Sequence, residues 1–368
     1  MDMQKAGAIK GLLMGYSTAH LVTSNLAIGM HFNLFSILEA GSTDGLTVEE
    51  LASRAQIKNV RVLKEWALCL VANGFLECKE SSDGERYVIS PEAALFFRMD
   101  GNPFSGFWPF LNSLRILPQL QPVLVEKYAT GTGFQWGDLP EPVHDGVTDF
   151  FAPVYEHLLP SWMKLHPDTH RKLQTGGKLL DIGCGAGKST CVLAREYPEA
   201  TFVGVDYHKG SIVKASERAD HDGRKNAVFK VADSGSASWH GTGEADVVSF
   251  FDCFHDMENP GGAAKQAYAA LKDDGVVILI EPLSSDEEGV SGKCSLPTTG
   301  LFSGASSHIC TLNALGADGT GAGLGACCPT SKHRELFKEA GFKSLDVLSM
   351  DGPFAPTANG FRFMLATK

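Results

Sequence analysis

One glycine-rich stretch, KLLDIGCGAGK at residues 178–188, constrains this chain more than any other. Its apolar start is typical of a buried strand, and glycines then alternate at Gly183, Gly185 and Gly187. Apolar residues follow over 189–197 with the spacing of a helix that packs on a sheet. Strand, glycine turn and helix in this order predict a nucleotide site at the carboxyl end of a parallel strand. Glycine is needed there because a Cβ atom would block both the tight turn and the approach of a ligand.

Three types of ligand-binding loop are possible interpretations of this stretch. A dinucleotide-binding loop needs G-x-G-x-x-G, but Lys188 stands at its last glycine position. A phosphate-binding loop ends in G-K-[ST], which Gly187, Lys188 and Ser189 match, yet its first glycine would fall on Ile182. The pattern D-x-G-x-G-x-G, which begins at Asp181, resembles motif I of the class I S-adenosylmethionine-dependent methyltransferases. The resemblance implies that Asp181 and the three glycines bind this cofactor; a glycine turn without a ligand is the alternative.

Two further acidic residues end short apolar segments after the glycines. Asp206 ends TFVGVD about 20 residues further on, where a carboxylate can accept hydrogen bonds from ribose hydroxyls. Asp233 follows a third predicted strand and, by the resemblance, lies where the family holds the adenine amino group. Either acid could instead merely end a strand in a turn. The ordered set predicts an α/β fold with a Rossmann-like, seven-stranded methyltransferase sheet, and the resemblance implies that its closing strands, 345–350 and 362–367, are antiparallel.

The catalytic candidate lies in FFDCFHDMENP, just after the fourth predicted strand. An imidazole has an ordinary pKa of about 6.5, so His255 could accept the proton of a substrate hydroxyl. The stretch resembles the H-D-W motif of small-molecule O-methyltransferases of the plant type, which implies that His255 is the general base. By the same resemblance, Glu281 at the end of strand five orients the ring or raises its pKa. Met257 replaces the tryptophan of the plant enzymes, so the resemblance does not carry over their phenylpropanoid substrates. The alternatives are a core or capping histidine and a strand-ending acid.

With 368 residues the chain is long enough for more than one domain. We predict a helical and winged-helix dimerisation domain over 1–100. A helical connector or substrate lid, rich in proline and aromatic residues, follows over 101–175, and an S-adenosylmethionine-binding methyltransferase domain over 176–368. Apolar and small residues over 12–40 indicate helices that would form a homodimer; core helices are the alternative. Irregular glycines over 301–328 predict a mobile loop that covers the site.

The winged-helix prediction rests on two helices followed by a hairpin. Thr47 and Glu50 have the spacing of a capping box for a first helix over 48–55. A second helix is expected over 60–73, and a hairpin turn at 82–84. The second helix has few basic residues and is apolar almost all round, so we expect it to be buried rather than to read DNA.

Composition excludes several classes of partner. The net charge of −11 argues against nucleic acid and anionic membranes. No apolar run approaches the ~20 residues of a membrane span, and residues 1–10 do not resemble a signal peptide. Nine cysteines, an odd number at scattered spacings, indicate reduced thiols and a cytoplasmic protein. A metal or thiol site could be formed by residues late in the chain: Cys294, His308, Cys310, Cys327 and Cys328. These cysteines contain no C-x-x-C pair, so we expect no metal. His308 is also considered as an alternative base.

These observations predict transfer of a methyl group from S-adenosylmethionine to a small-molecule acceptor, with a hydroxyl as the expected nucleophile. N- or C-methylation on the same scaffold is the nearer alternative. A cofactor-sensing, winged-helix DNA-binding regulator is a different class, which a basic surface on that module would favour.

Overall fold

The structure is a computed structural model that describes residues 1–81, 84–236, 243–286, 294 and 296–368. It divides into two compact units: Met1–Ile116 with Asp145–Pro153, and Leu117–His144 with Val154–Lys368. The segment predicted as a connector, 101–175, contributes to both units. The boundaries of the three-part division given above stay a prediction.

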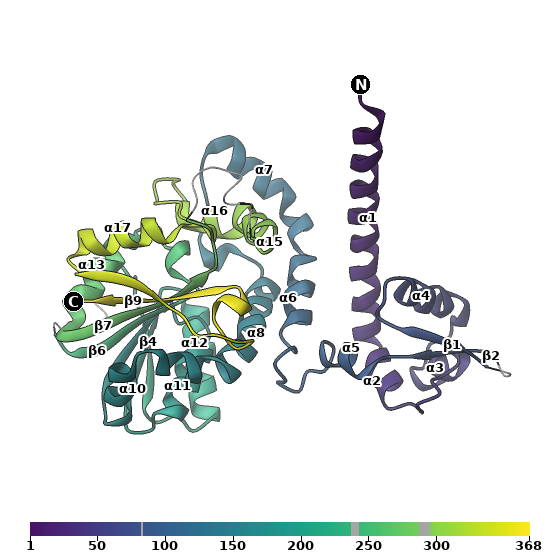
Figure 1. Ribbon diagram of the computed structural model, residues 1–368, viewed down its shortest axis with the longest axis horizontal. Helices are drawn as coiled ribbons and strands as arrows, with labels where there is room; N and C mark the ends of the chain where they lie inside the picture. The colour runs from purple at the N-terminus through teal and green to yellow at the C-terminus, as the bar shows by residue number, and fades with distance from the viewer. Residues whose placement is uncertain (82–83, 237–242, 287–293, 295) are drawn as a thin grey trace. The chain divides into compact units, whose positions relative to one another are not determined.

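The second unit contains a seven-stranded sheet with the strand order β5-β4-β3-β6-β7-β9-β8 (Figure 1). The first five strands of this sheet along the chain pair in parallel, whereas β9 pairs antiparallel with both β7 and β8. The fold class and the antiparallel closing strands predicted from the sequence are thereby confirmed. The strands are β3 Lys178–Ile182, β4 Thr201–Asp206, β5 Ala227–Val231, β6 Ala245–Phe251, β7 Leu271–Pro282, β8 Ser344–Leu348 and β9 Phe361–Thr367.

Helices cover both faces of this sheet, which is why its central strands read as nearly continuous apolar runs. Every residue of β6 is buried. Figure 1 shows α10, α11 and α12 on one face, and α13 and α17 on the other. These helices are α10 Pro167–Gln174, α11 Lys188–Glu196, α12 Lys209–His221, α13 Pro260–Ala270 and α17 Thr330–Ala340. Among the helices of the described residues, none has the length and apolarity needed to cross a bilayer.

Shorter elements complete the second unit. The helix α8 contributes to both units. The helices are α7 Gln121–Thr130, α8 Glu141–His157 and α9 Leu159–Trp162. The 3-10 turns are η1 Leu117–Leu120, η2 Trp136–Asp138, η3 Met163–Leu165, η5 Phe254–Asp256 and η7 Thr357–Asn359.

The mobile loop predicted over 301–328 is wrong in its first half. Helix α15 Thr299–Ala305, the π-helical segment η6 Ser306–Cys310 and helix α16 Thr311–Leu315 follow one another without a break. The reason is visible in the sequence, because Gly304 is the only glycine from 301 to 315 and the other glycines of the segment come later. Segments of π-helix occur mostly as single turns, frequently at functional sites.

The first unit has the predicted order of two helices and a hairpin. The capping box is present, since Thr47 and Glu50 exchange hydrogen bonds with each other's backbone N–H. The hairpin is antiparallel, and Leu46 bridges to Tyr87 beside it; residues 82–83 of the predicted turn lie outside the described residues. The elements are α1 Met3–His31, α2 Leu34–Glu39, α3 Val48–Arg54, α4 Val60–Ala72, β1 Glu77–Ser81, β2 Gly84–Val88, α5 Pro91–Leu95 and α6 Phe107–Leu114.

The expectation that the second helix of this module is buried all round is wrong. Helix α4 buries one face, which carries Leu63, Trp66 and Leu70. Its opposite face exposes 60% of Val62 and 57% of Leu68. An amphipathic helix buries only the stripe that faces its own core, and the apolar residues outside that stripe remain exposed within one chain.

Candidate active site

The glycine turn after β3 has the backbone conformation that its sequence predicts. Gly183, Gly185 and Gly187 have φ angles of +70°, +51° and +73°, a region that other residues rarely occupy. A Cβ atom on Gly183 would meet the Cys253 sulfur at 2.7 Å, and one on Gly187 would meet Ala215 at 2.8 Å. A Cβ atom on Gly185 would have nothing within 4 Å. The outer glycines therefore allow close packing, and the middle one faces open space.

Asp181 lies beneath this turn with both carboxylate oxygens in use. Its Oδ2 accepts hydrogen bonds from the hydroxyls of Ser189 and Thr190 at 2.8 and 2.6 Å, and its Oδ1 accepts one from Ser249 at 2.9 Å. The side chain is fully buried, and burial raises its pKa. Asp181 thus connects β3 to the start of α11 and to β6, which holds the glycine turn in place.

The two other predicted cofactor acids lie at the same edge of the sheet. Asp206 Oδ2 accepts from the N–H of Gly185 at 2.9 Å, and its Oδ1 accepts from the N–H of His208 at 2.8 Å. Burial raises the pKa of Asp206. Asp233 is exposed, and its Oδ1 accepts from the N–H of Gly235 at 2.7 Å. The carboxylate of Asp206 is therefore fixed directly beside the open space at Gly185, an arrangement that fits a ribose.

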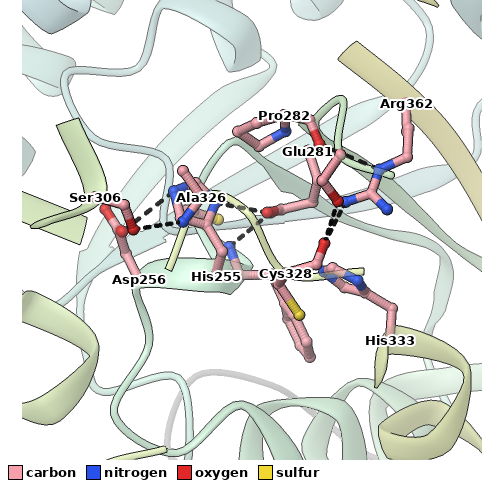
Figure 2. A network of polar contacts seen from close by, with 12 residues as sticks. His255, Asp256, Glu281, Pro282, Ser306, Ala326, Cys328, His333 and Arg362 are labelled. Atoms are coloured by element: carbon pink, nitrogen blue, oxygen red, sulfur yellow. Dashed lines mark hydrogen bonds and ion pairs between the residues drawn. The ribbon is translucent and has the colours of Figure 1, made fainter. Parts of the chain in front are cut away.

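His255 forms a buried pair with Glu281, as Figure 2 shows. The ring lies in η5, just after β6, and only 3% of the residue is exposed. Its Nδ1–H donates to Glu281 Oε2 at 2.5 Å, while Glu281 Oε1 accepts from the N–H of Phe254 at 2.9 Å. The other ring nitrogen, Nε2, lies 3.2 Å from Asp256 Oδ1. The structure thus brings both predicted catalytic residues together and adds Asp256 to them.

Two carboxylates decide the charge of this imidazole. Burial by itself lowers the pKa of His255, but the nearby charges of Asp256 and Glu281 hold it well above its ordinary value. Burial raises the pKa of Glu281, and the positive charge of His255 more than reverses this effect. The two carboxylates thus favour the protonated ring, which must lose a proton before it can act as a base.

Cys310 joins the same cluster from the π-helical segment. Its sulfur, a nitrogen of His255 and an oxygen of Asp256 all lie within 4.8 Å of one another, which within the described residues is the group with the spacing of metal ligands. Burial raises the pKa of the Cys310 thiol to about 12, so the sulfur is a neutral donor next to the carboxylate. His308, weighed as an alternative base, has its Nδ1 2.9 Å from the Gly304 oxygen. The other weighed cysteines, Cys294, Cys327 and Cys328, are not members of this group.

Arg362 is a buried cation that sequence reasoning missed. It stands opposite Glu281 in the antiparallel pair of β7 and β9. Its guanidinium donates to the backbone oxygens of Pro282 and Cys328 at 3.1 and 2.7 Å and to the Thr330 hydroxyl at 2.7 Å (Figure 2). The signal available in the sequence was a single charged residue inside the apolar strand FRFMLAT.

Comparisons with known proteins agree with the fold that carries these residues. Residues 173–314 match the family model described as a methyltransferase domain. A tRNA (guanine-N(7)-)-methyltransferase of Rubrobacter xylanophilus is 52% identical over 54 residues, which is 15% of this chain and 24% of that protein. The chain spans between 24% and 31% of the length of the first three curated relatives.

Solved structures are similar over nearly the whole chain. An O-methyltransferase family protein from Burkholderia thailandensis has a TM-score of 0.70 at 15% identity, with 97% of each chain covered. Human N-acetylserotonin methyltransferase, solved in complex with S-adenosylmethionine, has a TM-score of 0.68 at 16% identity, with 98% of this chain and 97% of that chain covered. The chain therefore has the fold of these methyltransferases, and its residues 173–314 match the model of a methyltransferase domain.

Proposed function

We propose that this protein transfers a methyl group from S-adenosylmethionine to the hydroxyl of a small-molecule acceptor. The observation that carries the proposal is the buried His255–Glu281 pair, in which His255 follows β6 and Glu281 is near the end of β7, at the same sheet edge as the glycine turn. An oxygen nucleophile must lose a proton during methyl transfer, and a histidine oriented by a carboxylate is the group that general-base chemistry requires. The methyltransferase domain and the O-methyltransferase among the similar structures support this proposal.

The cofactor would supply an electrophilic methyl group on a sulfonium, so the protein mainly supplies position and a dry site. In our proposal Gly183, Gly185 and Gly187 admit the cofactor, and Asp206 binds its ribose. Asp233 binds the adenine amino group, as the resemblance implies. Asp181 contributes indirectly, because its oxygens are engaged with three hydroxyls that hold the turn.

The proton would pass from the acceptor hydroxyl to Nε2 of His255, while Glu281 keeps the opposite N–H in place. Because Nε2 faces Asp256 in this structure, the acceptor oxygen must take the place of Asp256 at Nε2. The base must also be neutral when the acceptor arrives, so we expect the reaction to speed up toward alkaline pH.

N- or C-methylation remains the alternative, in which His255 would only bind the acceptor. The DNA-binding regulator is less well supported, since the two basic residues of α4 are paired: Arg61 with Glu65, and Lys64 with Glu85 at 2.9 Å. A reading helix needs unpaired basic residues on one face. We therefore propose no nucleic-acid partner.

A homodimer is part of the proposal. Helix α1 is 29 residues long but buries only Val22, Leu26 and Gly29 within its own chain. Its large exposed side chains are Met3, Ile9, Leu12, Leu13, Met14, Tyr16, Leu21 and Ile28. Contiguous exposed apolar surface of this kind marks interaction sites, and a second copy supplies the same surface in return. The cytoplasmic location belongs to the proposal as well, and it rests on the reduced thiols expected from the sequence.

The test uses S-adenosylmethionine labelled with ¹³C at its methyl group, the full-length protein and a set of small phenols, alcohols and amines. We expect the labelled carbon to appear as a methyl ether, which NMR distinguishes from N-methyl and C-methyl products. Label on nitrogen or carbon alone would favour the alternative. Failure of the wild-type protein to bind S-adenosylmethionine in titration calorimetry would end the methyltransferase proposal.

A further inference from the structure

Asp252, the first residue after β6, has an unusual backbone. Its φ angle is +55°, in the left-handed region that residues other than glycine seldom occupy. The N–H of Asp252 donates to the backbone oxygen of Ile280 at 2.7 Å, which continues the contact between β6 and β7 and fixes this conformation. Positive φ in a residue with a side chain costs free energy, and such residues cluster at functional sites.

The sheet register brings Asp252 level with the glycine turn. Ile182 pairs with Phe250 where β3 and β6 run in parallel, so the residues that follow each of them leave the sheet side by side. The next residue, Cys253, donates its thiol to the Ile182 oxygen at 3.0 Å and occupies the space that a Cβ on Gly183 would need. Asp252 therefore directly precedes the residue that packs against the glycine turn, and it lies three residues before the proposed base, His255.

The carboxyl of Asp252 has a buried oxygen that is not satisfied. Within the described part of the chain, its Oδ1 is buried and has no hydrogen-bond partner. An unsatisfied buried acceptor destabilises the folded protein, and in native structures it calls for an explanation such as an absent ligand. Burial raises the pKa of Asp252 to about 7. The titratable groups that act on this carboxyl or respond to it are Tyr155, Cys253, His255, Asp256, Glu281 and Cys310.

A methyl donor of the S-adenosylmethionine type has two cationic groups, a sulfonium and an ammonium. The acid of the glycine motif, Asp181, is 0% exposed, and its oxygens already accept hydrogen bonds from three hydroxyls, so our proposal assigns it to neither group. An orphaned hydrogen-bond acceptor needs an N–H donor; the ammonium has three, whereas the sulfonium has none. We propose that Asp252 is the carboxylate that binds the ammonium end of the methyl donor.

This assignment rests on the proposed function and makes Asp252 a cofactor-binding residue next to the reacting atoms. It also offers a reason for the left-handed φ of Asp252, because strained backbone of this kind clusters at functional sites. The charge of the ligand would keep the carboxyl ionised, which offsets the effect of burial on its pKa.

Two variants test the assignment without straining the backbone. Asp252→Asn keeps the shape and removes the charge, and asparagine is among the residues that tolerate positive φ. Asp252→Gly removes the side chain at a φ that glycine adopts freely. Calorimetry with each variant should compare three ligands: S-adenosylmethionine, S-adenosylhomocysteine, which keeps the ammonium, and 5′-methylthioadenosine, which lacks it. Glu258→Gln, an exposed acid six residues further on, is the matched control.

We expect both variants to weaken S-adenosylmethionine and S-adenosylhomocysteine about 10-fold or more, the size of one hydrogen bond to a charged group, and to leave 5′-methylthioadenosine unchanged. Equal weakening of all three ligands, or no weakening at all, would overturn the assignment. Weakening of S-adenosylmethionine alone would also overturn it, because the acid would then serve the sulfonium. A wild-type protein that binds none of the three would instead refute the proposed function.

Discussion

His255 and Glu281 lie at the ends of two adjacent parallel strands, and their side chains meet at 2.5 Å, with 3% of His255 and 0% of Glu281 exposed. Neighbouring strands that end at the same edge bring the two residues together although 26 positions separate them in sequence. Glu281 is held in turn by the N–H of Phe254. The imidazole therefore has a fixed orientation, and only its Nε2 is left for a proton from outside.

Replacement of His255 by glutamine should lower kcat by about 10²–10⁴, which is the usual contribution of a positioned general base. Affinity for S-adenosylmethionine should stay nearly constant, because our proposal assigns cofactor binding to the glycine turn, Asp206, Asp233 and Asp252 and not to His255. Steady-state kinetics with titration calorimetry separates the two effects, and His308→Gln serves as the control. The proposal of O-methylation with His255 as base would be wrong if the glutamine variant kept more than about a third of the wild-type rate. Such a variant would have lost far less activity than the removal of a general base should cost.

The pH profile should report the two carboxylates at His255. Because Asp256 and Glu281 hold the pKa of the imidazole well above 6.5, the neutral base forms only as the pH rises through that higher value. We therefore expect kcat/KM to have an ascending limb above neutrality, whereas the sequence alone predicts an ascending limb near neutrality. Asp256→Asn removes one negative charge and should move the limb toward lower pH. A limb that stays in place in this variant would show that another group controls the rate.

The same pKa shift has a consequence for stability. A histidine whose pKa is raised by folding binds its proton more tightly in the folded state, so it stabilises the protein below the unfolded-state pKa of about 6.5. This contribution disappears as the pH rises through the folded-state value. The alkaline conditions that activate the base therefore also remove some of the stability that its ion pairs provide.

Asp206→Ala should strongly weaken S-adenosylmethionine. The carboxylate orders the turn through the N–H of Gly185 and, in our proposal, accepts from the ribose, so two effects are lost together. We expect a rise in Kd of at least 10-fold, the loss of one hydrogen bond to a charged group. Calorimetry measures this change, Asp220→Ala on the exposed surface of α12 is the control, and NAD should not bind to either protein. Tight NAD binding without a response to S-adenosylmethionine would contradict the cofactor assignment.

Local patterns in the sequence predicted the elements that local physics determines. The alternating glycines, the apolar strands and the Thr47–Glu50 capping box are each specified by neighbouring residues, and the structure has all of them. The helix over Thr299–Leu315 was missed because glycines counted over the whole segment hid a glycine-poor first half.

The parts of the site that could not be predicted depend on contacts between distant residues. The sequence predicts that Asp181 binds the cofactor, but it does not show that Ser249, 68 positions away, donates a hydrogen bond to the same carboxylate. Cys310 reaches His255 only because α15, η6 and α16 form a continuous helical run. The orphaned oxygen of Asp252 is a property of its surroundings, and no residue type or spacing reveals it.

The last prediction concerns assembly through α1. Leu13 and Leu21 are 61% and 62% exposed in one chain, so their replacement by glutamate should leave the fold of the chain intact. If a second copy covers these leucines, each replacement removes about 1.5–3 kcal/mol of stabilisation from apolar burial and adds a buried charge. The dissociation constant of the dimer should therefore rise at least 10-fold for each replacement. Light scattering over a dilution series should give a dimer for the wild type and a monomer for Leu13→Glu/Leu21→Glu. Lys10→Glu, on the same helix, reverses a charge without removing apolar surface and should remain dimeric. The homodimer proposal would be wrong if the wild-type protein were monomeric and fully active at low concentration. The exposed leucines of α1 would then need a different explanation.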